Sequence, residues 1–187
     1  MSNLEDNLGT VHEIGCSGAD WGNGIAGSLS DLFYNTIRPE KVKTRVQIST
    51  YTLGRKNSEV EEFFEILNDL VIKNKRKVVL IINDDKTDTF NSCSLFAKGK
   101  LKELHDKDSE KFQYYFFNSK LHAGKLLHAK LVIVDRKIAL IGSANISKKA
   151  LSSNYEVMLK VSGDVVSRLS LMLDNLAKML EDESNVK

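Results

Sequence analysis

The chain has 187 residues, of which 42% are hydrophobic and 28% are charged, and its formal net charge at pH 7 is +2. This length suits one domain with a sizeable core, and the apolar content excludes a chain that is disordered throughout. The near balance of charge gives no bulk attraction for nucleic acid, so a basic surface would have to come from uneven placement of lysine and arginine.

The sequence carries few signs of export or of metal binding. Its two cysteines, Cys16 and Cys93, lie far apart and form no ligand pattern, which indicates a reducing compartment. The first ten residues lack the basic and apolar regions of a secretory signal. No apolar run approaches the length that spans a bilayer. We therefore expect a cytoplasmic protein without stable membrane association.

The N-terminal part predicts a strand, a glycine-rich connection and a short helix. Residues 11–14 (VHEI) read as the strand, and residues 15–27 (GCSGADWGNGIAG) as the connection. Such a stretch before a helix either binds phosphate through backbone N–H groups or serves only as a flexible turn, and no fingerprint spacing decides between these alternatives. Ser28 or Ser30 would cap the helix, which stops before Pro39.

The next segment reads as strand, helix and strand. Residues 45–52 (RVQISTYT) predict the first strand, and Ser58 and Glu61 have the spacing of a capping box at the start of an amphipathic helix. Residues 77–83 (KVVLIIN) form a continuous apolar run, typical of a strand that is covered on both faces. This order and spacing predict a βαβ unit with parallel strands.

Two polar loops follow, separated by a helix and a strand. The acidic side chains of loop 84–91 fit either a metal site or, since no ligand spacing is present, an ordinary solvated loop. Ser92 or Ser94 would start the helix, and residues 111–117 (KFQYYFF) read as a strand whose tyrosines either pack or stack on bases. The loop at 118–126 holds three side chains that either meet a polyanion or are simply solvated: Lys120, His122 and Lys125.

The stretch from His128 to Asn145, HAKLVIVDRKIALIGSAN, carries the strongest chemical signal. His128 and Lys130 are two residues apart, so on a strand they would project from one face. The β-branched run after them supports a strand, and the step at Asp135 resembles a hairpin turn. An imidazole can attack phosphorus or donate a proton, and an ammonium offsets charge on phosphate oxygens. The pair is suited to displacement at a phosphorus centre.

The last elements predicted are a strand and a long helix. Residues 154–161 (NYEVMLKV) read as the strand, in which Glu156 would be costly to bury without a partner. An amphipathic helix follows from Asp164, and its apolar stripe is more simply core than partner surface.

The stretch around the histidine resembles a known family signature. The signature of the phospholipase D superfamily specifies six positions, and the chain resembles it at these: His128, Lys130, Asp135, Gly142, Ser143 and Asn145. Together with the predicted elements, the resemblance implies an α/β fold with a mixed, largely parallel central sheet flanked by helices on both faces. This phospholipase D-like fold would form a single domain over residues 1–187.

The resemblance also implies a reaction that uses side chains and neither a metal nor a cofactor. His128 would attack phosphorus and form a covalent phosphohistidine. A second motif histidine would then protonate the leaving oxygen, and water would release the phosphoryl group. Lys130, Ser143 and Asn145 would bind the substrate phosphate.

Asp135 and Glu156 complete the predicted catalytic set of His128, Lys130, Asp135 and Glu156. On a regular strand Asp135 faces away from His128, so we expect it to support the motif through hydrogen bonds rather than to transfer a proton. Members of the family carry a glutamate at the distance of Glu156, bonded to the other ring nitrogen of the histidine. A carboxylate there fixes the tautomer and stabilises the imidazolium.

Many members of the superfamily carry two copies of the motif, whereas this chain has one. Because the mechanism needs two facing histidines, the resemblance implies a homodimer with the active site on its two-fold axis. The leading prediction is a metal-independent endonuclease that acts on DNA rather than RNA. The alternatives are a phospholipid-cleaving phospholipase D or phosphatidyltransferase, and a non-catalytic nucleic-acid-binding module. The lack of a basic amphipathic helix favours the nuclease.

Overall fold

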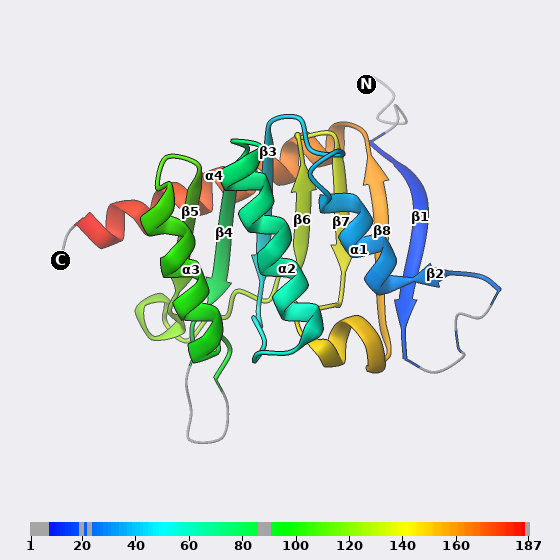
Figure 1. Ribbon diagram of the computed structural model, residues 1–187, viewed down its shortest axis with the longest axis horizontal. Helices are drawn as coiled ribbons and strands as arrows, with labels where there is room; N and C mark the ends of the chain where they lie inside the picture. The colour runs from blue at the N-terminus through cyan, green and yellow to red at the C-terminus, as the bar shows by residue number, and fades with distance from the viewer. Residues whose placement is uncertain (1–7, 19–20, 22–23, 86–90, 186–187) are drawn as a thin grey trace, which may run out of the picture.

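The computed structural model describes residues 8–18, 21, 24–85 and 91–185, which form one eight-stranded sheet with helices on both faces (Figure 1). The strands are β1 (Thr10–Ser17), β2 (Gly27–Ser28), β3 (Arg45–Thr50), β4 (Lys77–Asn83), β5 (Phe112–Phe117), β6 (Leu131–Val134), β7 (Ile138–Gly142) and β8 (Glu156–Ser162). The α-helices are α1 (Leu29–Ile37), α2 (Ser58–Asn68), α3 (Leu95–Lys107) and α4 (Asp164–Asn185). Short turns of other helix types are η1 (Asp69–Lys73), η2 (Ser119–His122) and η3 (Lys149–Ser153).

The sheet is mixed, with the strand order β2-β1-β8-β7-β6-β3-β4-β5. Strands β3, β4 and β5 run parallel and are joined through α2 and α3, which confirms the predicted βαβ unit. The pairing of β1 with β2 is also parallel. The other four pairings among the described strands are antiparallel: β6, β7 and β8 follow one another as a meander, and its outer strands pair with β3 and β1. The sheet is therefore less parallel than the sequence predicted.

Strands β6 and β7 form the hairpin that the sequence predicted at Asp135. The N–H of Lys137 donates to the carbonyl of Val134 at 2.9 Å. The two central residues, Asp135 and Arg136, have φ angles of 53° and 58°. Left-handed residues at both central positions match the twist of the flanking strands, and aspartate tolerates this conformation better than most residues.

Helices α1, α2 and α3 cover one face of the sheet, and α4 crosses the other (Figure 1). Successive side chains of β6 pack on opposite faces of the sheet: Val132 belongs to the core under α1–α3, and Ile133 to the core under α4. This double burial explains why β6 is apolar at every position. The apolar stripe of α4 packs as core, as predicted, with Val166 and Leu173 buried; Met172, assigned to that stripe from the sequence, is exposed.

The helix caps agree with the sequence in two of three cases. Ser28 caps α1 and Ser94 caps α3, each accepting a backbone N–H from the third residue along. The predicted capping box at Ser58 is wrong. Asn57 is the N-cap of α2, with its side-chain oxygen accepting from the N–H of Val60 at 3.0 Å, and Ser58 lies inside the helix. Asparagine one position earlier offers an equally good acceptor.

Four neighbouring strands bring their ends to one edge of the sheet. In the order β8-β7-β6-β3 each strand is antiparallel to the next, so the starts of β8 and β6 lie beside the ends of β7 and β3. Most of the predicted site residues stand within three residues of these ends. In the described ranges no helix is both long and apolar enough to cross a membrane.

Candidate active site

His128 and Lys130 lie directly before β6 and not within it, so the predicted strand starts three residues too early. They nevertheless approach the same aromatic ring. The centroid of the His128 ring is 5.0 Å from that of Tyr51, and the Lys130 Nζ is 5.7 Å from the same centroid. His128 is exposed, whereas Lys130 is 6% exposed. One side chain is therefore open to a substrate while the other is enclosed beside it.

Buried polar side chains hold the backbone on each side of His128. The N–H of Leu127 donates to Oδ1 of Asn83 at 3.1 Å, and the hydroxyl of Ser49 donates to the carbonyl of Ala129 at 3.0 Å. Asn83 and Ser49 lie at the ends of β4 and β3 and are buried. These bonds tie an otherwise irregular segment to the rigid sheet, which is what precise positioning of a reactive side chain requires.

Lys130 is an enclosed cation. Burial lowers the pKa of its ammonium, and the charge of Glu156 opposes this shift. Its Nζ donates to the carbonyl of His128 at 2.8 Å. An ammonium has three N–H donors, so this bond leaves others for a phosphate oxygen. Tyr51 contributes its ring face to the same charge.

Ser143 and Glu156 meet where β7 ends and β8 begins. The hydroxyl of Ser143 donates to Oε2 of Glu156 at 2.5 Å and accepts from the N–H of Val157 at 3.2 Å. Asn154 donates to the other carboxylate oxygen at 3.4 Å. The predicted hydrogen bond from the His128 ring to the carboxylate of Glu156 is not among those of the described residues. Within one chain Glu156 instead orders Ser143 and acts on Lys130 through its charge.

Asn145 is oriented by the chain that continues from β3. Its Oδ1 accepts from the N–H of Thr52 at 2.9 Å and from the hydroxyl of Thr50 at 3.4 Å. Because the oxygen is held in this way, the N–H groups of the amide are the part that can face an anion. This orientation suits the predicted contact with a phosphate oxygen.

Gly142, at the end of β7, lies in close contact with β8. A Cβ atom at this position would collide with the carbonyl oxygen of Val157 and with the Cα of Met158 in β8. The close passage of β8 is a sufficient reason for a residue without a side chain.

Asp135 stands at the opposite end of β6 from His128. Its Oδ1 accepts from the N–H groups of Thr44 and Arg45 at 2.7 and 3.0 Å and from the Thr44 hydroxyl at 2.7 Å, and its Oδ2 accepts from the N–H of Lys43 at 2.8 Å. The carboxylate joins the β6–β7 turn to the start of β3. We propose that Asp135 supports the motif and takes no part in proton transfer, as expected because an odd number of positions separates it from His128.

Replacing Asp135 should lower stability more than catalysis. Asp135→Ala leaves several N–H donors without their acceptor, so we expect a loss of about 3 kcal/mol in the free energy of unfolding. Asp135→Asn keeps one acceptor oxygen and tolerates positive φ, so its loss should be about 1 kcal/mol. Urea denaturation measures both, with the exposed Asp182→Ala as control. A large loss of turnover at unchanged stability would contradict the supporting role.

The Asp135 carboxylate also makes the stability of the protein depend on pH in the acidic range. Burial raises the pKa of Asp135. The hydrogen bonds from the N–H groups of Arg45, Lys43 and Thr44 and from the Thr44 hydroxyl have the opposite and larger effect, so the pKa lies below the ordinary value. A depressed pKa adds stability above the pKa of the unfolded chain. This contribution is lost as pH falls through the folded-state value, and Asp135→Ala should flatten that part of the profile.

The remaining predicted features are the glycine-rich segment, the acidic loop and the loop at 118–126. Residues 19–20, 22–23 and 86–90, in the glycine-rich and acidic segments, lie outside the described residues. Asp84 pairs with Lys98 at 2.7 Å, and Asp85 accepts from Ser119, so both acids have structural partners. His122 stacks on Phe117 with 4.1 Å between ring centroids. Among the described residues no three His, Cys, Asp or Glu side chains are grouped as metal ligands.

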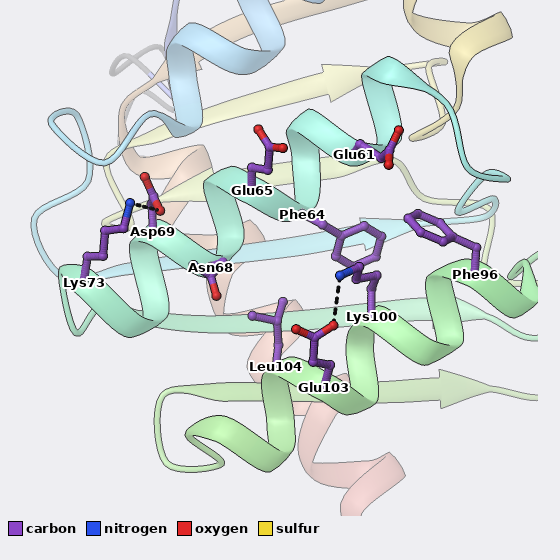
Figure 2. Close-up of a pocket in the computed structure, with 10 residues that line it drawn as sticks. All are labelled: Glu61, Phe64, Glu65, Asn68, Asp69, Lys73, Phe96, Lys100, Glu103 and Leu104. Carbon is purple, nitrogen blue, oxygen red and sulfur yellow. Dashed lines mark hydrogen bonds and ion pairs between the residues drawn. The ribbon is translucent and has the colours of Figure 1, made fainter.

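A hollow of about 380 Å³ lies between α2 and α3, away from the strand ends (Figure 2). Phe64, Phe96 and Leu104 contribute its apolar lining, and the ion pairs Lys73–Asp69 and Lys100–Glu103 border it. It contains none of the predicted site residues. The candidate active site is the edge where β3, β6, β7 and β8 meet.

Sequence reasoning missed Tyr51, Ser49 and Asn83. Each stands at or just after the end of a strand, where a polar or aromatic residue looks like ordinary packing. Their position at the ends of adjacent strands was the available signal, since functional side chains gather there in α/β sheets.

Comparisons with known proteins bear on the family and the fold of the chain. A family model described as cardiolipin synthase, PLD-like domain, matches residues 40–177. No protein with a curated function matches the chain in sequence.

Three solved structures share the fold. NucT from Helicobacter pylori has a TM-score of 0.57 and 19% identity, with 93% of this chain and 96% of that chain covered. Nuc from Salmonella typhimurium, a phospholipase D family member, has a TM-score of 0.59 and 16% identity, with 95% of each chain covered. Phosphatidylserine synthase of Haemophilus influenzae has a TM-score of 0.62 and 14% identity, with 92% of this chain and 39% of that chain covered.

Proposed function

Because the chain belongs to the phospholipase D superfamily, with a PLD-like domain over residues 40–177, we propose that it is a metal-independent nuclease. The observation that carries the proposal is the joint placement of His128 and Lys130 against Tyr51, at the sheet edge that also holds Ser143 and Glu156. An exposed imidazole beside an enclosed ammonium is suited to attack on a phosphodiester.

The proposed reaction proceeds through a covalent intermediate. A ring nitrogen of His128 attacks phosphorus, and the bond from phosphorus to the leaving oxygen breaks. A second imidazole donates its proton to that oxygen. The second imidazole then takes a proton from water, and this water attacks the phosphohistidine and restores free His128. Lys130 and the amide of Asn145 stabilise the charge that develops on the other phosphate oxygens.

The second imidazole is proposed to come from a second copy of the chain. The sequence contains one copy of the motif, and His128 is exposed at the sheet edge. A two-fold axis beside this edge would place two copies of His128 on opposite sides of one phosphate. In that assembly Glu156 would orient an imidazole, as predicted.

A panel of substrates in chelator tests the activity. We expect the wild-type protein to cleave labelled DNA in the presence of EDTA, to cleave RNA less well, and to leave phospholipid vesicles intact. Release of product is measured by gel electrophoresis and, for lipid, by headgroup release. His128→Ala is the control for contaminating nucleases. Strict dependence on a divalent cation would contradict the proposed mechanism.

The same panel separates the alternatives. The fold shared with phosphatidylserine synthase supports a lipid-directed phospholipase D or phosphatidyltransferase as the second candidate. Headgroup release or exchange without cleavage of nucleic acid would establish it. Binding of DNA without cleavage of any substrate would instead establish a non-catalytic module.

The shared site predicts that activity follows dimer formation. Sedimentation should give twice the chain mass of 21.0 kDa at concentrations where cleavage is observed. On dilution, the specific activity should fall together with the dimer fraction, because each monomer holds only half of the histidine pair. Full activity in a sample that sediments as monomer would overturn the shared site.

A further inference from the structure

Trp21 and Tyr155 form an exposed aromatic pair. Their ring centroids are 6.0 Å apart at an interplanar angle of 72°, so the edge of one ring meets the face of the other. The side chains are 51% and 69% exposed, although rings of this size usually bury most of their area. A perpendicular pair of this kind forms a corner with open ring faces.

The corner stands beside the candidate active site. Tyr155 directly precedes Glu156, and Glu156 is the register partner of Ser17 in the pairing of β1 with β8. The indole N–H of Trp21 donates to the carbonyl of Ser17 at 2.7 Å. Both rings are therefore attached to the strand ends that hold the carboxylate of Glu156.

The end of β1 is tied to the chain that leads into β8. The hydroxyl of Ser17 donates to the carbonyls of Ala150 and Asn154 at 2.7 and 2.8 Å. A Cβ at Gly18, where φ is 89°, would meet the backbone of Asn154 and Tyr155. Tyr155 is thus presented from a fixed backbone, and the indole of Trp21 is bonded to the same place at Ser17, which lowers the entropy lost when a ligand stacks on the rings.

Exposed lysines stand on the turn that is bonded to the end of β1. The turn that Ser17 contacts begins after Lys148 and includes Lys149, and both lysines are exposed. Exposed aromatic rings, together with exposed lysines on a turn bonded to the same strand end, match the chemistry of single-stranded nucleic acid, in which bases stack and phosphates attract cations. The indole N–H is already donated to Ser17, so the ring offers its π face and no donor for a lipid carbonyl.

We propose that Trp21 and Tyr155 are a base-binding subsite, which selects nucleic-acid strands with an unpaired base next to the phosphate that is cut. Only a base that has left its stack exposes a face to the corner, so the substrate class is single-stranded nucleic acid. This inference rests on the proposed nuclease function and extends it to the strandedness of the substrate.

The protein contains one tryptophan, so its indole emission reports on the corner directly. The experiment titrates the His128→Ala protein, which does not turn over the ligand, with a single-stranded oligonucleotide. The comparison ligand is an abasic oligonucleotide of the same length and charge. We expect the normal strand to quench the emission, and the abasic strand to bind about 10-fold more weakly without quenching.

Variants test the two rings separately. In the His128→Ala background, binding is followed by the fluorescence anisotropy of a labelled strand, because Trp21→Ala removes the only indole. Trp21→Ala and Tyr155→Ala should each weaken binding of the normal strand about 10-fold, while Tyr155→Phe retains it. Met172→Ala, exposed on α4, is the matched control and should leave affinity unchanged. Equal affinity of Trp21→Ala, Tyr155→Ala and the parent would overturn the subsite.

The outcomes also separate the subsite from the function beneath it. Cleavage of DNA by the wild-type protein without quenching in the His128→Ala protein would overturn the subsite alone. Absence of both cleavage and binding would overturn the nuclease and the subsite together. A blue shift with phosphatidylglycerol vesicles, in place of quenching by the oligonucleotide, would assign the corner to a lipid surface and overturn the base-binding proposal.

Discussion

His128→Ala is expected to abolish cleavage, with a loss of turnover on the order of 10⁴-fold. No other group at the sheet edge replaces a nucleophile that forms the covalent intermediate, so the loss should appear in kcat rather than in binding. The oligonucleotide should still bind within about threefold of its wild-type affinity, because the neighbouring Lys130 and Asn145 remain. Single-turnover cleavage assays and fluorescence anisotropy measure the two quantities.

The matched control is His12→Ala. His12 of β1 is also exposed, but its ring contacts Ser162 of β8 at 2.6 Å, at the opposite end of the sheet from His128. This variant should cleave normally. In the wild-type protein, rapid denaturation during turnover followed by mass spectrometry at alkaline pH should find the phosphoryl group on His128. A phosphoryl group on another residue, or normal turnover by His128→Ala, would remove the nucleophile assignment.

Lys130→Met should reduce turnover by about 10²- to 10³-fold, the usual effect of removing one group that stabilises transition-state charge. Methionine fills similar space without charge. Because Lys130 is 6% exposed, its ammonium is desolvated, and its removal should leave the free energy of unfolding within about 1 kcal/mol of wild type or raise it. Loss of activity without loss of stability distinguishes a substrate-binding lysine from a structural one.

Lys137→Met is the control for this substitution, since Lys137 is exposed in the β6–β7 turn. Lys137→Met should change neither the turnover nor the free energy of unfolding. If Lys130→Met lost several kcal/mol of stability while retaining turnover, Lys130 would be a structural residue and the phosphate contact would have to be reassigned.

The buried ammonium also predicts a pH dependence. Burial lowers the pKa of Lys130, and Glu156 only partly offsets this effect. Since the charged form binds phosphate, cleavage should decline on the alkaline side at a lower pH than an ordinary lysine would give. The sign for stability is opposite: the unfolded chain binds the proton more tightly, so stability rises as pH passes upward through the folded-state pKa. Lys130→Arg should move the alkaline decline to higher pH.

Local patterns in the sequence predicted most of the elements. The apolar runs of β4 and β6 indicated strands covered on both faces, and Asp135 marked the hairpin between β6 and β7. These features depend on neighbours within a few residues, so they can be read from a single chain. The motif spacing from His128 to Asn145 also predicted the family, which the match over residues 40–177 establishes.

The sequence alone determined which side chains are candidates for the chemistry, and the tertiary structure decided which of them meet. Tyr51 contacts His128 and Lys130 only because β3 lies antiparallel to β6, and Trp21 reaches Tyr155 only because β1 pairs with β8. Asp135 belongs to the motif by spacing, yet the length of β6 places it at the far end of the strand. Pairing between strands distant in sequence sets these contacts, and it depends on burial across the whole sheet rather than on any local pattern.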